Sequence, residues 1–346
     1  MILNSFGSRI KELRTEKMMP QLDLAKASGI DRAQISKIEK GKINVTLETI
    51  DKLAFALNIE LKELMNLSID DTIHPFVKWA GGKTQILNKL KSFLPTNYNE
   101  YYEPFVGGGA LLFSLRPKVA HINDQNYELV CAYKCFKNKE DFNSLKFSLK
   151  EHEKKHSEEY YYQVRALDKD SNYNNFSLAE KASRMIYLNK ACFNGLYRVN
   201  SKGYFNVPSG KKEKVNTFDE DNFIALEKFF TNNKITITSD DFEIAVKNAK
   251  AGDFVYFDPP YDVYPDKNGF VDYGKEGFGK EEQIRLCKCY TDLNKKGVKV
   301  MLSNHNTEFI NELYKDFNIH VIDAKRMINS NPNGRGNVQE VIITNY

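Results

Sequence analysis

The chain has 346 residues, of which 41% are hydrophobic and 28% are charged, so its length favours two or more domains of ordinary globular composition. No apolar run approaches the roughly 20 residues that span a bilayer, and the polar N-terminal stretch lacks a signal peptide's apolar core, so we expect a cytoplasmic protein without membrane contact. The net charge is only +4, with 50 Lys and Arg against 46 Asp and Glu, which neither requires nor excludes a nucleic-acid partner.

Residues 1–66 form the first predicted domain, a series of short helices in which apolar residues recur at helical spacing. Gly29 is placed to end one helix, and Asp31 stands where the N-cap of the next helix is expected. Residues 67–75 carry no apolar periodicity and end in Pro75. We therefore interpret them as a linker to a second domain.

From residue 76 to residue 346, apolar strands alternate with helical stretches, interrupted by a mostly helical, polar insertion at about 130–235. We expect strands over 101–105, 119–124, 235–242, 254–257, 298–304, 318–324 and 338–346, and helices over 110–115, 243–250 and 281–296. This alternation predicts an open α/β sheet with ligands at the carboxyl ends of its strands. Residues 197–214 of the insertion are typical of a loop or a hairpin.

Asp258-Pro259-Pro260-Tyr261 directly follows the apolar strand 254–257. The amino group of adenine is a poor nucleophile because its lone pair is delocalised into the ring. Asp258 and the carbonyl of Pro259 could accept its two hydrogens, which would turn the lone pair toward an electrophilic methyl group. The prolines would stiffen the turn, and Tyr261 offers a face on which a flipped base can stack. An ordinary turn at the end of a strand is the alternative.

Further motifs surround this turn in a fixed order. They are FVKWAGGK at 76–83, EPFVGGG at 103–109, Asp124, FNGLYR at 193–198, GYFNVP at 203–208, Asp241-Phe242 and Ser303-Asn304. Together with the turn, they resemble the Dam-like family of DNA adenine-N6 methyltransferases, the D12 class, over residues 74–346. The resemblance implies a Rossmann-like methyltransferase sheet, S-adenosyl-L-methionine as the methyl donor, and a target-recognition role for the insertion.

The resemblance also implies a pocket for S-adenosyl-L-methionine. Its residues would be Trp79, Lys83, Glu103, Phe105, Gly107, Gly109, Asp124, Asp241, Phe242 and Asp258. The glycines let the backbone approach a ligand closely, and Asp124 ends a strand where an acid can bond ribose hydroxyls. Asp241 can accept from the cofactor's adenine amino group, and Phe242 can stack on that ring. For Trp79, a place in the core is the alternative.

The stretch around Lys83 superficially resembles a phosphate-binding P-loop. That motif requires a glycine at position 77, where this chain has Val77. An ATPase is therefore disfavoured.

A second set of residues would contact DNA. By resemblance these are Lys78 and, in the insertion, Phe193, Asn194, Leu196, Arg198, Pro208, Gly210 and Lys211. Arg198 suits a bidentate contact with guanine. Phe193, Asn194 and Leu196 would surround the displaced base. Pro208, Gly210 and Lys211 would line the duplex. Solvated surface positions are the alternative. The motif most resembles enzymes that act on GATC or on longer sites beginning with GAT.

Residues 5–66 resemble the lambda-repressor/Xre type of helix-turn-helix. Gln21 opens the second helix, and Arg32, Gln34 and Lys37 project from the candidate recognition helix toward the major groove. A helical bundle used for dimerisation or for stability is the alternative.

The five cysteines form no C-x-x-C pair and are odd in number, which argues against a disulfide framework or a zinc site. We expect reduced, buried thiols and no bound metal.

One stretch matches the family only loosely. Residues 262–278 are glycine-rich and charged, which indicates a loop that closes over the cofactor and offers Tyr273 for a DNA contact.

The sequence is best explained by a site-specific adenine methyltransferase that flips its target base in double-stranded DNA. It would act with a cognate restriction endonuclease in a restriction–modification system, or as a solitary methylase. Two alternatives stay open: methylation of another exocyclic amine, such as cytosine N4 or an RNA adenine, and a transcriptional regulator that senses S-adenosyl-L-methionine without catalysis. The oligomeric state is not predicted.

Overall fold

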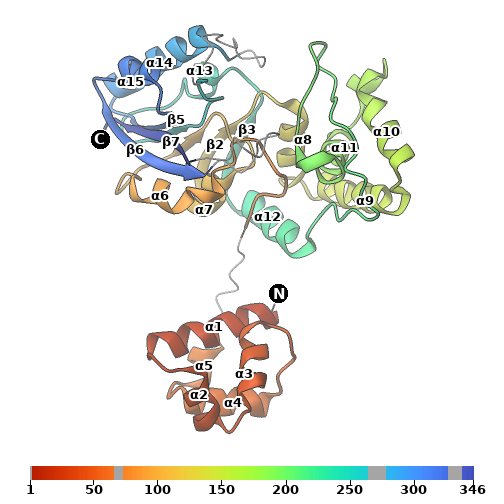
Figure 1. The fold of residues 1–346 in the computed structure, drawn as a ribbon, viewed down its shortest axis with the longest axis vertical. Coiled ribbons are helices and arrows are strands. Elements are labelled where there is room, and N and C mark those ends of the chain that lie inside the picture. The colour runs from red at the N-terminus through yellow and green to blue at the C-terminus, as the bar shows by residue number, and fades with distance from the viewer. Residues whose placement is uncertain (1, 66–72, 264–277, 326–336) are drawn as a thin grey trace. The chain divides into compact units, whose positions relative to one another are not determined.

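The computed structural model describes residues 2–65, 73–263, 278–325 and 337–346, and the chain divides into two compact units, Met1–Thr72 and Ile73–Tyr346 (Figure 1). The predicted linker at 67–75 lies largely outside the described residues. Within it, His74 belongs to the second unit, because its backbone N–H and carbonyl each bond the side-chain amide of Asn222 at 3.0 Å.

The first unit is a helical domain. Its helices are α1 (Ile2–Glu16), α2 (Gln21–Ser28), α3 (Arg32–Glu39), α4 (Leu47–Ala56) and α5 (Leu61–Leu64). Gly29 ends α2 with a φ of 66°, and the Asp31 carboxylate caps α3 by accepting from the N–H of Ala33 at 3.3 Å. Leu24 and Ile35, one from each of these helices, are fully buried. The expected helix-turn-helix is confirmed.

The second unit is built on a seven-stranded sheet with the order β3-β2-β1-β4-β5-β7-β6. The strands are β1 (Tyr101–Glu103), β2 (Val119–Asn123), β3 (Lys234–Thr238), β4 (Phe254–Phe257), β5 (Lys299–His305), β6 (Asn318–Lys325) and β7 (Asn337–Thr344). The first five strands are parallel, and β7 runs antiparallel to both of its neighbours. The direction of strand order changes between β1 and β4, which is where open α/β sheets bind ligands.

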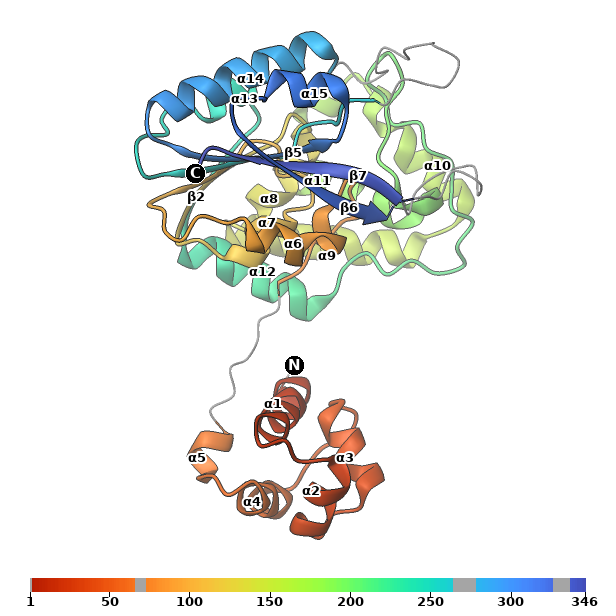
Figure 2. The same cartoon turned by 60° about the vertical axis from the view of Figure 1, so that its left-hand side comes forward.

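Helices cover both faces of the sheet (Figure 2). The helices of the second unit are α6 (Leu87–Ser92), α7 (Ala110–Leu115), α8 (Tyr127–Cys135), α9 (Lys139–Lys155), α10 (Glu158–Ala166), α11 (Leu178–Ala191), α12 (Glu220–Asn232), α13 (Phe242–Ala245), α14 (Lys280–Lys295) and α15 (Glu308–Leu313). Because side chains alternate along β4, Phe254 and Tyr256 join the core with α6–α8 and α12, whereas Val255 and Phe257 join the core with α13–α15. All four β4 residues are buried.

Short 3₁₀ segments complete the described helical structure: η1 (Lys83–Gln85), η2 (Leu167–Lys169), η3 (Tyr173–Asn175) and η4 (Phe193–Gly195). The insertion between β2 and β3 is helical from α8 to α12, as expected. Its 193–211 segment folds back on itself through the bridges Cys192–Ser209 and Val199–Phe205, which confirms the hairpin-like interpretation. No helix in the described part of the chain is long and apolar enough to cross a membrane.

The strand expected over 101–105 ends at Glu103, and two other predicted elements are shorter by three residues or more. The strand expected over 235–242 ends at Thr238, because the N–H of Asp240 bonds Asn123 at 2.7 Å and Asp241 then caps α13. The helix expected over 243–250 stops at Ala245, and a turn follows. The five cysteines are free, and four of them are buried, as expected.

Candidate active site

The end of β4 carries a buried ion pair. Asp258 follows the strand directly, and the Lys83 ammonium lies 2.7 Å from Asp258 Oδ1. The Asp258 side chain is only 17% exposed and the Lys83 side chain only 7%. Lys83 also donates to the carbonyl of Gly81 and lies over the Tyr261 ring, 4.6 Å from its centroid. The Tyr261 hydroxyl in turn donates to Glu340 on β7 at 3.3 Å. A carboxylate, an ammonium and an aromatic ring therefore meet at the sheet's switch point.

Burial controls the electrostatics of this cluster. It raises the pKa of Asp258, although the Lys83 ammonium and the Tyr261 hydroxyl both act to lower that pKa. It also raises the pKa of Glu103 to about 8 and the pKa of Glu340, each with a smaller contribution from the charge of Asp258. The positive charge of Lys83 acts to lower the pKa of all three carboxyl groups, so it favours the ionised form of each.

The turn after β4 is braced from α14 and β5. Pro259 is buried and Pro260 is exposed, and the Gln283 side chain donates to the Pro260 carbonyl at 2.9 Å. Asn304 donates to Gln283 at 3.1 Å and accepts from the N–H of Asp262 at 2.9 Å. Both ends of the turn are thus fixed by buried amides, which holds the Asp258 carboxylate and the Pro259 carbonyl in place.

The glycine run after β1 brings the backbone close to Trp79. Gly107 adopts a φ of 48°, and a Cβ added there would lie 2.7 Å from the Trp79 ring. Its N–H donates to Asp124 at 3.0 Å, and burial raises the pKa of Asp124 to about 6. Gly109, with a φ of 73°, is the N-cap of α7. The ends of β1 and β2 thus bring Trp79, the glycines and Asp124 together.

Asp241 and Phe242 lie nearby at the start of α13, next to Phe105, whose ring centroid is 5.6 Å from that of Phe242. Phe242 is only 1% exposed, and the Arg285 guanidinium lies 4.4 Å from its ring centroid while pairing with the Asp241 carboxylate. The two predicted adenine-binding groups are therefore adjacent, and Arg285 covers both.

The predicted DNA-contacting residues of the insertion lie on one loop. Phe193, Asn194, Arg198, Pro208 and Lys211 are exposed, and Leu196 is half-buried. The Gly210 backbone packs so tightly that an added Cβ would lie 2.7 Å from two carbonyl oxygens of residues 191–192. This loop presents polar and apolar side chains together, as contacts to a duplex and to a displaced base require.

Lys78 comes from another part of the chain but adjoins this loop. An added Cβ on Gly195 would lie 2.7 Å from the Lys78 side chain. The buried side chain of Asn189 accepts from the Lys78 N–H at 3.0 Å and donates to the Lys78 and Gly195 carbonyls at 2.8 and 3.0 Å. The structure therefore brings Lys78 and the insertion residues together.

In the first unit, Arg32, Gln34 and Lys37 are exposed on α3. Gln21 instead donates to the buried carboxylate of Glu39 at 2.7 Å, so its side chain is already engaged within the domain. The predicted contact of Tyr273, like the rest of 264–277, lies outside the described residues.

Four residues that the sequence interpretation missed stand at this site: Asn189, Gln283, Arg285 and Glu340. Only Gln283 had an indirect signal, since it bonds Asn304, which was part of a recognised motif. The others carry no spacing that would distinguish them from ordinary helix or strand residues.

A model of the D12 class of N6 adenine-specific DNA methyltransferases matches residues 79–328, and a helix-turn-helix model matches residues 10–64. The Type II methyltransferase M1.LlaDCHI of Lactococcus lactis subsp. cremoris is 44% identical over 84% of this chain and 99% of its own length. The Type II methyltransferase M.MjaIII of Methanocaldococcus jannaschii is 42% identical over 79% of this chain and 99% of its own length. The crystal structure of the restriction–modification controller protein C.AhdI from Aeromonas hydrophila is 49% identical over 18% of this chain and 96% of that chain, with a TM-score of 0.18.

Proposed function

The chain belongs to the D12 class of N6-adenine-specific DNA methyltransferases, and we propose that it transfers the methyl group of S-adenosyl-L-methionine to an adenine flipped out of double-stranded DNA. The observation that carries this proposal is the Asp258–Lys83 pair at the switch point of the sheet, followed by a braced Pro-Pro turn. The donor would supply an electrophilic methyl group on a sulfonium.

The residues after β4 would prepare the acceptor. Asp258 and the Pro259 carbonyl would each accept one N6 hydrogen, so that the nitrogen lone pair points away from the ring plane. N6 would take the methyl group from the donor, whose sulfur would keep the electron pair of the broken carbon–sulfur bond, and Asp258 would accept the surplus N6 proton. The Lys83 ammonium acts to lower the pKa of Asp258 and so favours its ionised form, and Tyr261 would stack on the flipped base.

The groups at the ends of β1, β2 and β3 fit the donor. Trp79, packed against Gly107, would line its pocket, together with Glu103 at the end of β1 and Gly109 at the turn into α7. Asp124 has lone pairs left for ribose hydroxyls after accepting two backbone N–H bonds. Phe105, Asp241 and Phe242 would hold the adenine end, which requires Arg285 to move aside or to stack on the ligand.

Arg198 would read a guanine of the target, which is GATC or a longer site beginning with GAT. Its side chain is exposed, and its Nε donates to Asn206 at 2.7 Å, which leaves the terminal nitrogens of the guanidinium fork facing outward. Lys78 and the remaining insertion residues would position the duplex and surround the displaced base.

The helix-turn-helix would bind DNA through Arg32, Gln34 and Lys37, with Gln21 beside them. Two relatives carry the name Type II methyltransferase, which supports a restriction–modification setting with a cognate endonuclease over a solitary role.

The test is direct. The full chain is incubated with methyl-labelled S-adenosyl-L-methionine and, in parallel reactions, with unmodified duplex DNA or with RNA, and the nucleic acid is digested to nucleosides for mass spectrometry. We expect label in N6-methyldeoxyadenosine. Label in N4-methyldeoxycytidine would contradict the acceptor assignment. Label in RNA alone would contradict the DNA substrate, and donor binding without transfer to either would favour a regulator.

A further inference from the structure

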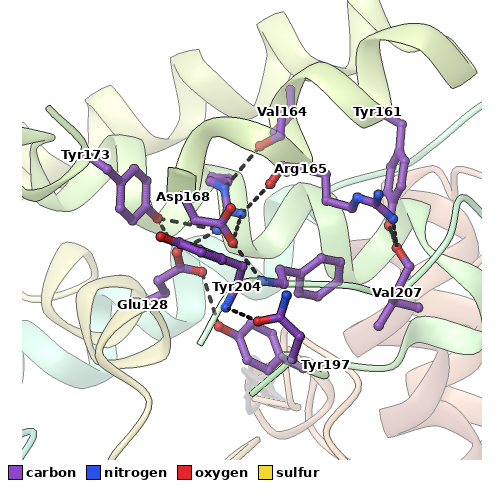
Figure 3. A network of polar contacts seen from close by, with 12 residues as sticks. Glu128, Tyr161, Val164, Arg165, Asp168, Tyr173, Tyr197, Tyr204 and Val207 are labelled. Carbon is purple, nitrogen blue, oxygen red and sulfur yellow. Dashed lines mark hydrogen bonds and ion pairs between the residues drawn. The ribbon is translucent and has the colours of Figure 1, made fainter. Parts of the chain in front are cut away.

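A network of polar contacts that includes Glu128, Asp168 and Tyr197 connects several segments of the insertion (Figure 3). Arg184 on α11 is 1% exposed and pairs with Glu128 on α8 at 2.6 Å and with Asp168 in η2 at 2.8 Å. It also donates to the carbonyls of Val164 and Arg165 at 3.1 and 2.8 Å. Because one buried guanidinium bonds acceptors in α8, in α10 and in η2, this network fixes these segments of the insertion relative to one another.

The network extends to the loop that carries Arg198. The N–H of Phe205 donates to Asp168 at 2.7 Å, and the Tyr197 hydroxyl donates to Glu128 at 3.4 Å (Figure 3). The rings of Tyr197 and Phe205 also meet edge to face, 5.3 Å apart. Tyr197 directly precedes Arg198, so the backbone that presents Arg198 is held from both strands of the loop.

Tyr197 also reaches the other side of the site. Its ring stacks on Trp79, with centroids 5.2 Å apart and planes inclined by 28°. Trp79 packs on Gly107, whose N–H bonds Asp124. One tyrosine therefore contacts the proposed donor pocket through its ring face and the recognition network through its hydroxyl.

We propose that Tyr197 is a positioning residue that couples target recognition to donor binding, an inference that rests on the proposed function. A donor that packs on Trp79 favours one placement of that ring, and the stacked Tyr197 then favours one placement of the Arg198 loop. A target duplex that engages Arg198 acts through the same contacts in reverse. Coupling free energies are reciprocal, so the target should tighten donor binding by the same factor as the donor tightens target binding.

Trp79 is the single tryptophan of the chain, so its fluorescence reports on this stack. S-adenosylhomocysteine is titrated into the full chain in the absence and in the presence of an unmethylated duplex that contains the sequence which the chain methylates. The ratio of the two Kd values measures the coupling. For the native chain we expect the duplex to lower the Kd about fivefold or more. In Tyr197→Leu the ratio should fall to about one. Tyr197→Phe keeps the ring contacts with Trp79 and Phe205 and loses only the long 3.4 Å bond to Glu128, so it should retain most of the ratio.

Tyr162→Leu is the matched control, because Tyr162 lies on α10 in the same insertion and its ring packs on Tyr161 and Arg165. Its ratio should equal that of the native chain. If Tyr197→Leu does not fold, Tyr197→Met fills similar volume without a planar ring and should lose the ratio likewise. A ratio near one in the native chain, or an undiminished ratio in these variants, would overturn the proposal. Methylation by the native preparation separates this from failure of the proposed function, which would leave no product.

Discussion

The two regions predicted to meet DNA are built differently. On α3, Arg32, Gln34 and Lys37 project from a small helical domain with its own core. In the second unit, Asn189 and the network around Arg184 both hold the 193–211 loop. Asn189 also bonds the backbone of Lys78. From this difference we expect α3 to contribute separable DNA affinity, and we expect the loop to be joined to the proposed site of methyl transfer. Changes in the two regions should therefore have effects of different kinds.

The largest expected effect breaks the chemistry without touching either region. Asp258→Ala removes an oriented acceptor, and loss of such a group typically costs about 10²–10³ in rate. Single-turnover methylation should fall by at least that factor, while duplex binding measured by fluorescence anisotropy stays close to native. Asp292→Ala, at an exposed position on α14, is the control and should methylate normally. Near-native turnover of Asp258→Ala would disprove the catalytic assignment.

Lys83 provides a pH test of the same cluster. Its ammonium lowers the pKa of Asp258 against the opposing effect of burial, so Lys83→Met should raise that pKa further. Ionised Asp258 would be the stronger acceptor for N6 and the form that can take up its surplus proton, so activity should be present above the pKa and lost as the pH falls through it. The acidic limb of the kcat profile should thus move to higher pH in Lys83→Met and stay closer to native in Lys83→Arg. An unmoved limb would show that Lys83 does not control this carboxyl group.

A smaller effect should distinguish a loop residue that recognises a base from a loop residue that contacts the DNA backbone. A bidentate arginine–guanine contact is worth about 1–3 kcal/mol of discrimination. Arg198→Ala should lower kcat/KM on the true site and raise relative activity on sites that differ at one base pair. Lys211→Ala, also exposed, should weaken binding to all sequences equally and reduce the salt dependence. A uniform loss in Arg198→Ala, with specificity unchanged, would make Arg198 a backbone contact instead.

The smallest effect is expected on α3. The double variant Arg32→Ala/Lys37→Ala should leave kcat and the target unchanged and should reduce the slope of log Kd against log salt by about 0.9 for each lost phosphate contact. Filter binding over a range of salt concentrations measures this slope. A change in the methylated sequence would contradict the separation between the two regions.

The sequence predicts the strand-end groups well, because Asp124 and Asp258 each follow a short apolar strand, and strand ends meet at one edge of a parallel sheet. The helix-turn-helix was also predictable, since Gly29 and Asp31 act locally. Local signals failed where a capping interaction shortened a strand, as at Asp241.

The contacts that hold the site together were not predictable. Asn189 bonds a residue 111 positions away, and Tyr261 bonds Glu340 at a separation of 79. Amides and carboxylates of this kind occur throughout the chain, so only the fold selects them. The cover of Arg285 over Phe242 is a tertiary contact of the same type.

The central claim is that recognition and chemistry both reside in the second unit. The most direct test compares the full chain with a chain beginning at Asp71, each acting on unmodified genomic DNA that is then sequenced with detection of modified bases. We predict N6-methyladenine in the same GAT-containing sequence for both proteins. The shorter chain should require a higher protein concentration to reach the same extent of methylation. A folded shorter chain that methylates nothing, or that methylates a different sequence, would contradict it.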